Sequence, residues 1–225
     1  MKKVLVTGGA GYIGSVLVRI LLRKGYYVRV LDNLSFGGES LVELLNDKNF
    51  DFIKGDIRDN DILNTAMDGI DYVAHLASIV GDPACALDPN LTKDINLNGA
   101  YNTYNAANAA GVKKFVFAST CSNYGKMKDS NSYVKEESEL NPVSLYGETK
   151  VDAETVYRNV KNCATFRLAT VFGPSSRMRS DLLVNNFVLK ALKDRVLVLY
   201  ECEFMRNYIH ITDVCRAFRF VVDNW

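Results

Sequence analysis

The sequence predicts an α/β fold built on a doubly wound parallel sheet, and three observations lead to this prediction. Short apolar runs rich in β-branched residues alternate with longer segments of helical periodicity. A glycine-rich turn follows the first apolar run and opens the first helical segment. The apolar runs are continuous, as in Lys114-Phe115-Val116-Phe117-Ala118, which is typical of parallel strands covered by helices on both faces.

The individual elements follow from the same pattern. We expect strands near residues 3–7, 27–32, 50–54, 71–76, 114–119 and 164–169, and helices near residues 12–24, 39–47, 59–67, 92–110 and 144–160. Gly25 and Gly111 stand where two of these helices should end. The pattern changes after Gly173 and predicts a helix near 181–193, a strand near 195–200 and a last helix after residues 208–210.

Composition excludes several classes of protein. The 225 residues are 48% hydrophobic with a formal net charge of +1, so the chain can bury a core and has no basic stripe for nucleic acid or membrane. The five cysteines form no Cys-x-x-Cys pair and only two histidines accompany them, so we expect neither a metal site nor disulfides. No apolar run approaches the ~18 residues of a membrane span, and Met1 leads straight into the first strand. We expect a soluble, cytoplasmic protein.

The glycine-rich turn predicts a phosphate site. Gly8, Gly11 and Gly14 follow the apolar run at 4–6 and precede the first helix. Glycine permits the tight turn at 8, the approach of backbone to a pyrophosphate at 11 and close helix–strand packing at 14. Free N–H groups and the helix dipole then point at the anion. The spacing is Gly-x-x-Gly-x-x-Gly with no following Gly-Lys-Ser/Thr, which disfavours a P-loop.

An acidic residue at the end of the second strand indicates the nature of the ligand. Asp32 comes 18 residues after Gly14, close to the roughly 20-residue offset of the acid that binds the adenosine ribose of a dinucleotide. A carboxylate there accepts hydrogen bonds from the ribose hydroxyls and repels a 2′-phosphate. The sequence therefore predicts a Rossmann-type domain that binds NAD(H) and not NADP(H).

A second motif carries the expected chemistry. Tyr146 and Lys150 are four residues apart in a predicted helix and project from one face. A lysine ammonium beside a phenol favours the phenolate, so we expect a lowered pKa for Tyr146 and a role as base. The strand ending at Ala118 delivers residues 119–125 to the same crevice, where a hydroxyl could hydrogen-bond the substrate oxygen.

These motifs together resemble the extended short-chain dehydrogenase/reductases, in particular the NAD-dependent nucleotide-sugar epimerase/dehydratase family with its UDP-glucose 4-epimerase-like members. The similarity spans nearly the whole chain. Its markers are residues 7–14, 31–33, 55–59, 75–78, 119–125, 146–150, 167–174 and 206–214.

The resemblance implies a role for each matching residue. It places Gly8, Gly11, Tyr12, Ile13 and Gly14 on the pyrophosphate, Asp32 and Asn33 on the adenosine ribose, Asp56 and Ile57 at the adenine, Ala77 and Ser78 along the cofactor channel, and Tyr146 and Lys150 at the nicotinamide end. It implies the catalytic set Thr120, Tyr146 and Lys150, with Ser122 and Tyr124 facing the sugar and Arg206 meeting the nucleotide diphosphate. It implies no metal.

The implied reaction is oxidation of a nucleotide sugar at C4, with Tyr146 as base. Family members that are 4,6-dehydratases carry an Asp-Glu pair after the threonine, where this chain has Cys121 and Ser122. We therefore favour a 4-epimerase. A nucleotide-sugar reductase, another sugar-modifying member of the family, or a non-catalytic NAD sensor stays open as an alternative.

The resemblance also bears on domains and partners. We assign residues 1–172 to the NAD-binding domain and residues 173–225 to the start of a substrate-binding region whose later part we expect to be missing. Thr170 and Asn207 replace residues that are often Asn and Asp in the family, so the contacts near them are open. We expect a nucleotide sugar as substrate and a homodimer as the assembly.

Overall fold

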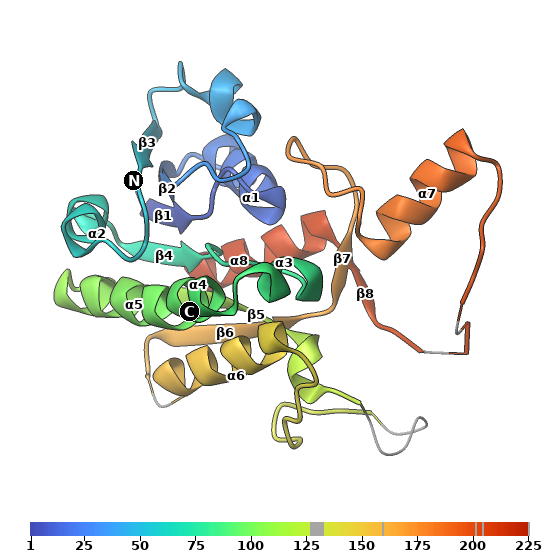
Figure 1. The fold of residues 1–225 in the computed structure, drawn as a ribbon. Helices are drawn as coiled ribbons and strands as arrows, with labels where there is room; N and C mark the ends of the chain where they lie inside the picture. The colour runs from blue at the N-terminus through green and yellow to red at the C-terminus, as the bar shows by residue number, and fades with distance from the viewer. Residues whose placement is uncertain (127–132, 159, 201, 204, 225) are drawn as a thin grey trace.

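The computed structural model contains a six-stranded parallel sheet with helices on both faces (Figure 1). It describes residues 1–126, 133–158, 160–200, 202–203 and 205–224. The strands of the sheet are β1 (Lys3–Thr7), β2 (Tyr27–Asp32), β3 (Phe50–Lys54), β4 (Tyr72–His75), β5 (Lys114–Thr120) and β6 (Cys163–Leu168). Their spatial order is β3-β2-β1-β4-β5-β6. The predicted fold class is confirmed.

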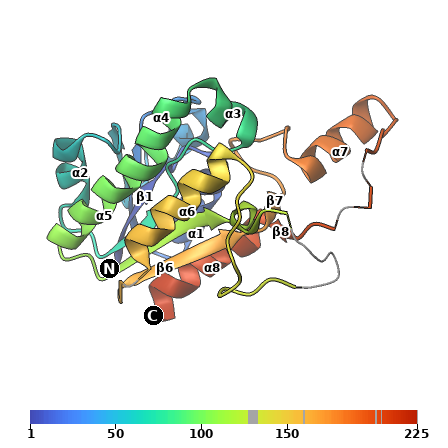
Figure 2. The same ribbon diagram turned by 60° about the horizontal axis from the view of Figure 1, so that its bottom comes forward.

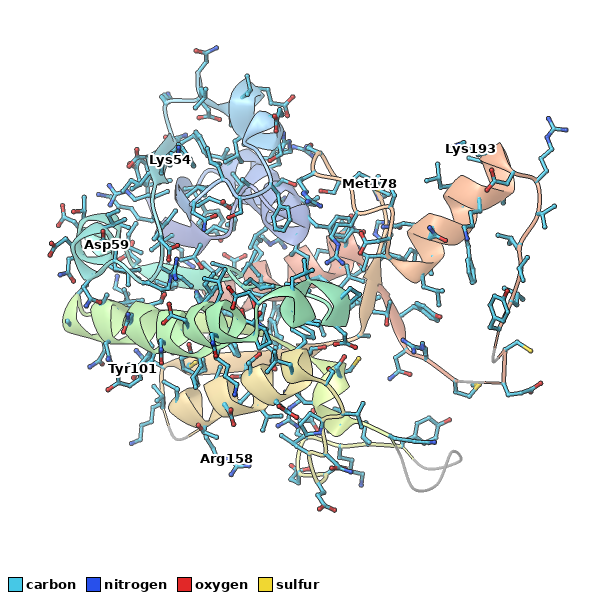
Figure 3. All side chains as sticks on the ribbon, viewed as in Figure 1. Lys54, Asp59, Tyr101, Arg158, Met178 and Lys193 are labelled. Carbon is cyan, nitrogen blue, oxygen red and sulfur yellow. The ribbon has the colours of Figure 1, made fainter. Side chains whose placement is uncertain are left out.

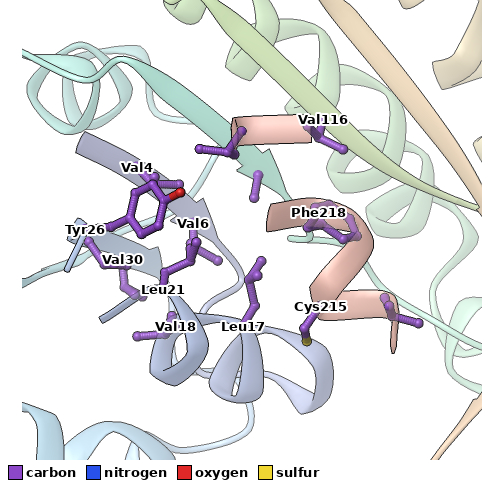
Figure 4. Close-up of a cluster of buried hydrophobic side chains, with 14 of the residues drawn as sticks. Val4, Val6, Leu17, Val18, Leu21, Tyr26, Val30, Val116, Cys215 and Phe218 are labelled. Atoms are coloured by element: carbon purple, nitrogen blue, oxygen red, sulfur yellow. The ribbon is translucent and has the colours of Figure 1, made fainter. Parts of the chain in front are cut away.

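One face of the sheet packs against the first and last helices of the chain. These are α1 (Tyr12–Arg23) and α8 (Ile211–Asn224). Val4 and Val6 of β1 point to this face and pack with Leu17 of α1 and Phe218 of α8, as the close-up in Figure 4 shows. All four side chains are almost completely buried. The predicted domain boundary after residue 172 stays a prediction, and α8, which follows it, contributes to the core of the sheet.

The other face carries α2 (Asn60–Met67), α5 (Gly99–Ala109) and α6 (Leu145–Tyr157). Leu5 of β1 and Phe115 and Phe117 of β5 point to this side and pack with Met67 and Tyr157. Rotating the molecule brings these helices forward and shows α5 and α6 side by side across the strands (Figure 2). The central strands β1, β4 and β5 are mostly buried on both faces, which explains their continuous apolar runs.

The predicted helix over 92–110 has an internal irregularity. It begins earlier, as α4 (Pro89–Lys93), and reaches α5 through a π-helical turn over Asp94–Asn98. Thr92 and Asn96 are both buried next to this turn. The helix predicted over 39–47 is a 3-10 helix, Glu39–Leu44. A short helix, α3 (Asp82–Leu87), precedes α4 and was not expected from the sequence.

A smaller two-stranded parallel sheet follows β6. It pairs β7 (Thr170–Phe172) with β8 (Tyr208–His210), and α7 (Leu183–Lys193) lies between them in the chain and projects away from the large sheet. The strand predicted near 195–200 is wrong, because these residues form no strand. Their side chains are exposed, and no neighbouring strand in the described part of the chain pairs with them.

Among the described residues, no helix is long and apolar enough to cross a membrane.

Candidate active site

The strand order places a crevice between two neighbouring strands. The chain winds outwards in opposite directions from β1 and β4, and a ligand site is expected beyond their carboxyl ends. Thr7 and His75 are the last residues of these strands and lie side by side. Thr7 Oγ1 and His75 Nδ1 are 2.7 Å apart in a buried hydrogen bond. Burial lowers the pKa of His75 to about 3, so this side chain is a neutral structural group.

The glycine-rich turn connects β1 to α1 at this crevice. Gly8 has a φ of +73°, and a Cβ atom on it would lie 2.7 Å from the backbone nitrogen of Ala77. A Cβ atom on Gly14 would lie 2.2 Å from the carbonyl oxygen of Gly8. Neither position can hold a side chain without moving backbone. Gly11 is the N-cap residue of α1, and no side chain caps the helix. No side chain therefore competes with an anion for the N–H groups of the first turn.

Tyr12 and Ile13 lie in that first turn. The Tyr12 hydroxyl donates to the carbonyl oxygen of Gly173 at 2.7 Å and accepts from Asn185 Nδ2 at 3.0 Å. Burial raises its pKa. Ile13 packs against the core below α1. The backbone N–H groups of these residues, and not their side chains, are therefore the groups that a pyrophosphate would meet.

Asp32 is fixed beside the turn at the end of β2. Its two carboxylate oxygens accept hydrogen bonds from the backbone N–H groups of Ala10, at 3.0 Å, and Leu34, at 2.8 Å. Burial nevertheless raises the pKa of the carboxyl above its usual value. Asn33 accepts from the N–H of Ser35 at 3.0 Å and is exposed to the crevice side of the loop. The carboxylate is thus held still, with lone pairs left for a ribose.

Asp56 is bound by an arginine that the sequence reasoning did not consider. Arg58 donates to both of its carboxylate oxygens at 2.9 Å and also reaches Asp94. These bonds hold the pKa of Asp56 below its usual value. Ile57 is buried against Gly99, where a Cβ atom would lie 2.6 Å from its Cδ1. The predicted adenine contacts of Asp56 and Ile57 stay predictions.

The segment after β4 is held by a buried amide. Asn96 Oδ1 accepts from the Ser78 hydroxyl and the Ile79 N–H, both at 2.8 Å, and Asn96 Nδ2 donates to Thr149 Oγ1 at 3.2 Å. Asn96 lies in the π-helical turn, and such turns often occur at functional sites. It joins the predicted cofactor channel at Ala77 and Ser78 to α6. The role of Asn96 depends on contacts between distant segments, so it could not be predicted from the sequence.

The three predicted catalytic residues converge at the carboxyl end of β5. Ser144 caps α6 through the Gly147 N–H, and Tyr146 and Lys150 follow on one face of the helix with the Lys150 ammonium 5.9 Å from the Tyr146 ring centre. Thr120, the last residue of β5, lies close enough to Tyr146 for its hydroxyl to affect the pKa of the phenol. Lys150 Nζ donates to the carbonyl oxygen of Ala118 at 3.1 Å.

The expected effect of Lys150 on Tyr146 is not found. Burial raises the pKa of the Tyr146 phenol, and the nearby Thr120 hydroxyl only partly opposes this shift. Burial also lowers the pKa of Lys150 to about 7. The prediction of a lowered phenol pKa is wrong for this structure, because desolvation of the buried phenol has the largest effect and raises its pKa.

The three predicted substrate residues lie around this centre. Ser122 is exposed, and its N–H donates to Thr120 Oγ1 at 3.1 Å. Tyr124 is less free, because its hydroxyl accepts from Arg167 at 3.0 Å. Arg206 is exposed before β8, and its charge acts on the thiol of Cys121. Their contacts with a sugar nucleotide stay predictions.

No group of three metal-binding side chains occurs among the residues that the structure describes.

Comparison with known proteins agrees with this arrangement. Residues 4–225 match the sequence model of the NAD dependent epimerase/dehydratase family. The chain belongs to this family. UDP-glucose 4-epimerase 2 of Oryza sativa subsp. japonica is 38% identical over 168 residues, which are 71% of this chain and 41% of the relative. The chain spans about half the length of the curated relatives it matches.

Two solved structures are similar over almost the whole chain. A UDP-N-acetylglucosamine 4-epimerase from Methanobrevibacter ruminantium, in complex with UDP-N-acetylmuramic acid, has a TM-score of 0.87 at 27% identity, covering 100% of this chain and 74% of its own. A dTDP-glucose 4,6-dehydratase from Streptomyces venezuelae, with NAD bound, has a TM-score of 0.86 at 31% identity, covering 98% and 71%. The fold is therefore shared by members with different reactions.

The residues of this chain fit NAD, the cofactor of the family. A glycine cradle that any Cβ atom would fill leads into an uncapped helix N-terminus, which suits a pyrophosphate. Asp32 is a partly buried carboxylate fixed by two backbone N–H groups, and its predicted contact with the adenosine ribose stays a prediction. Lys150 is buried, and its predicted contact with the second ribose stays a prediction.

Proposed function

We propose that this protein is an NAD-dependent epimerase that inverts a nucleotide sugar at C4. The observation that carries the proposal is the convergence of Thr120, Tyr146 and Lys150 at one end of the crevice. A phenol with a hydroxyl group close by and a buried amine beside it is suited to move one proton to and from a sugar hydroxyl. NAD, when bound, supplies the hydride acceptor for the carbon that carries this hydroxyl.

In this mechanism Tyr146 is the group that holds the proton. Its oxygen takes the proton of the sugar hydroxyl, which requires nearby positive charge to bring down the pKa that burial has raised, and the phenol returns the proton when the sugar is reduced on the opposite face. Thr120, whose hydroxyl lies near the phenol, would orient it through a hydrogen bond between the two groups. Lys150, whose pKa of about 7 lies near neutrality, offsets the charge of the phenolate when it carries its own proton.

Two residues favour epimerisation over dehydration. Cys121 and Ser122 stand where dehydratases of the family carry an acid and a base. Burial raises the pKa of the Cys121 thiol, so it remains neutral near pH 7 and is a poor proton donor or acceptor. Elimination of water would lack its additional acid and base. A nucleotide-sugar reductase is the second candidate, and a non-catalytic NAD sensor is less favoured because both Tyr146 and Lys150 are retained.

The experiment that tests the proposal is a substrate screen. UDP-, GDP-, dTDP- and CDP-sugars are added to the NAD-loaded protein, and both the reduction of the cofactor and the configuration of the product are followed. The proposal predicts transient reduction and a C4 epimer. Lasting formation of reduced cofactor together with an oxidised sugar would indicate a reductase working in reverse, and a 4-keto-6-deoxy product would indicate a dehydratase.

The oligomeric state and the cellular location of the protein are also proposals. We expect a homodimer and a cytoplasmic protein, and light scattering of the purified protein tests the first. Tyr101 on α5 is half exposed, so replacing it with a charged residue should weaken a dimer formed through this helix.

A further inference from the structure

An arginine outside all the predicted motifs lies over the crevice. Arg179 belongs to the loop between β7 and α7, which Figure 1 shows beside α1, and its neighbour Met178 is labelled in Figure 3. The loop is tied to the first turn of α1. Ser175 Oγ donates to the carbonyl oxygen of Tyr12 at 2.7 Å and lies 2.9 Å from Ser15 Oγ.

The backbone of Arg179 is fixed by the same amide that holds Tyr12. Asn185 Nδ2 donates both to the Tyr12 hydroxyl and to the carbonyl oxygen of Arg179, each at 3.0 Å. Asn185 is itself buried. The loop therefore has a defined position beside the glycine-rich turn, and the backbone of Arg179 is held in place.

The guanidinium extends from there across the crevice. A Cβ atom on Gly81, in the segment after β4, would lie 3.7 Å from Arg179 Nη2. The charge acts on Tyr12 on one side and on Tyr146 on the other. It thus lies between the turn that receives a phosphate and the residue at the reacting end, with its side chain only 21% exposed.

The present partner of Arg179 can be exchanged. Arg179 is paired with Asp181, two residues away, whose side chain is 65% exposed. An exposed carboxylate is readily solvated, so releasing the arginine costs little. A guanidinium with a planar fork of donors binds phosphate oxygens in a bidentate manner.

We propose that Arg179 binds the pyrophosphate of the dinucleotide cofactor from the side opposite to the glycine-rich turn. The loop from Gly173 to Asp181 then forms one wall of the cofactor site, and Ser175 and Asn185 hold that wall against α1. The hydrogen bonds that attach the loop to the first turn of α1 favour the cofactor over the diphosphate of a sugar nucleotide.

Calorimetric titration tests this assignment without measuring turnover. NAD and ADP-ribose, which share the pyrophosphate, are titrated into the wild-type protein and into Arg179→Gln, Arg179→Lys and Arg216→Gln. Arg216 is an exposed arginine of α8 that also pairs with a nearby aspartate and serves as the matched control. Circular dichroism and thermal unfolding check that each variant is folded.

The expected result is a loss of affinity for both ligands by about 10- to 100-fold in Arg179→Gln, as for other hydrogen bonds to charged groups. Arg179→Lys should lose less, because it keeps the charge, and Arg216→Gln should bind as the wild type does. The Arg179→Gln affinity should also depend less on salt. Unchanged affinity of Arg179→Gln for NAD overturns the proposal. A loss confined to UDP, titrated in parallel, overturns the assignment to the cofactor and moves Arg179 to the substrate.

Discussion

At the scale of single residues, burial determines the protonation states of His75 and Lys150 below the crevice. His75 and Lys150 are both almost completely buried, and desolvation lowers their pKa values to about 3 and about 7. Lys150 retains one hydrogen bond to a backbone carbonyl and lies 4.8 Å from the ring centre of Phe117. Neither contact compensates fully for the lost water. The site therefore holds a lysine that can lose its proton near neutral pH.

A pH-dependent stability follows from Lys150. The folded protein releases this proton near pH 7, whereas the unfolded chain keeps it to about 10.5. Between these values the unfolded state binds more protons, so stability rises with pH. We expect Lys150→Met to be more stable than the wild type at about pH 6, by of order 2 kcal/mol, with a smaller advantage at about pH 9. Urea unfolding at both pH values measures this, and an equal difference at both would contradict it.

Asp32 leads to a prediction about cofactor choice. Its carboxylate is held by two backbone N–H groups, so it cannot move away from a 2′-phosphate. The like-charge contact should cost of order 1 kcal/mol or more, so the protein should bind NAD in preference to NADP. Asp32→Asn keeps the shape and should reduce this preference. Titrating both cofactors into both proteins decides, and NADP binding as tight as NAD by the wild type would refute the assignment.

At the scale of elements, a partly buried ion pair joins α6 to the sheet. Glu154, one turn after Lys150, accepts from Arg167 of β6 at 2.7 Å and from Asn123 at 2.7 Å. The Ser119 hydroxyl, next to Thr120, donates to it at 2.5 Å. The helix that carries Tyr146 is thereby joined to the strand that carries Thr120.

We expect Glu154→Ala to be destabilising. Removing the carboxylate leaves a partly buried Arg167 without its ionic partner, which typically costs about 1–3 kcal/mol. Asp213→Ala is the control, because it breaks an exposed pair on α8 worth about 0–1 kcal/mol. Chemical unfolding compares the two variants. Equal effects would show that the ion pair does not hold α6.

Local sequence signals predicted the elements that depend on local chemistry. The glycine turn, Asp32 and the Tyr146–Lys150 spacing could be found because each is a pattern within a few residues. The strand near 195–200 was wrong, because apolar β-branched residues form a strand only where a partner strand is available. Asn96, Glu154 and Arg179 could not be found, since their roles arise from contacts between segments that the fold brings together.

At the scale of the whole molecule, α8 packs against the sheet beside α1, although it lies near the other end of the sequence. Phe218 of α8 is 1% exposed, packs edge-on against Phe166 of β6 at 5.2 Å between ring centres, and belongs to the same cluster as β1 and α1. Lys2 also donates to the carbonyl oxygen of Val222 at 2.9 Å. The helix that leads away from β8 is therefore part of the cofactor domain's core.

We expect Phe218→Ala to lower the free energy of unfolding by about 3–5 kcal/mol, through lost burial and the cavity that remains. Phe220 lies on the same helix but is 64% exposed, so Phe220→Ala should change stability by less than about 0.5 kcal/mol. Urea unfolding of both variants provides the measurement. A small effect at Phe218 would mean that α8 is not an integral part of the core.

The central claim is that Tyr146 transfers the proton in an NAD-dependent reaction on a nucleotide sugar. The most direct measurement compares NAD-loaded wild type with NAD-loaded Tyr146→Phe. A sugar nucleotide that the wild type converts is added to each protein, and reduction of the cofactor is followed by absorbance. Our account predicts that Tyr146→Phe keeps its fold and its NAD affinity but reduces the cofactor at least ~10²-fold more slowly. Reduction at a near wild-type rate in Tyr146→Phe would contradict the account.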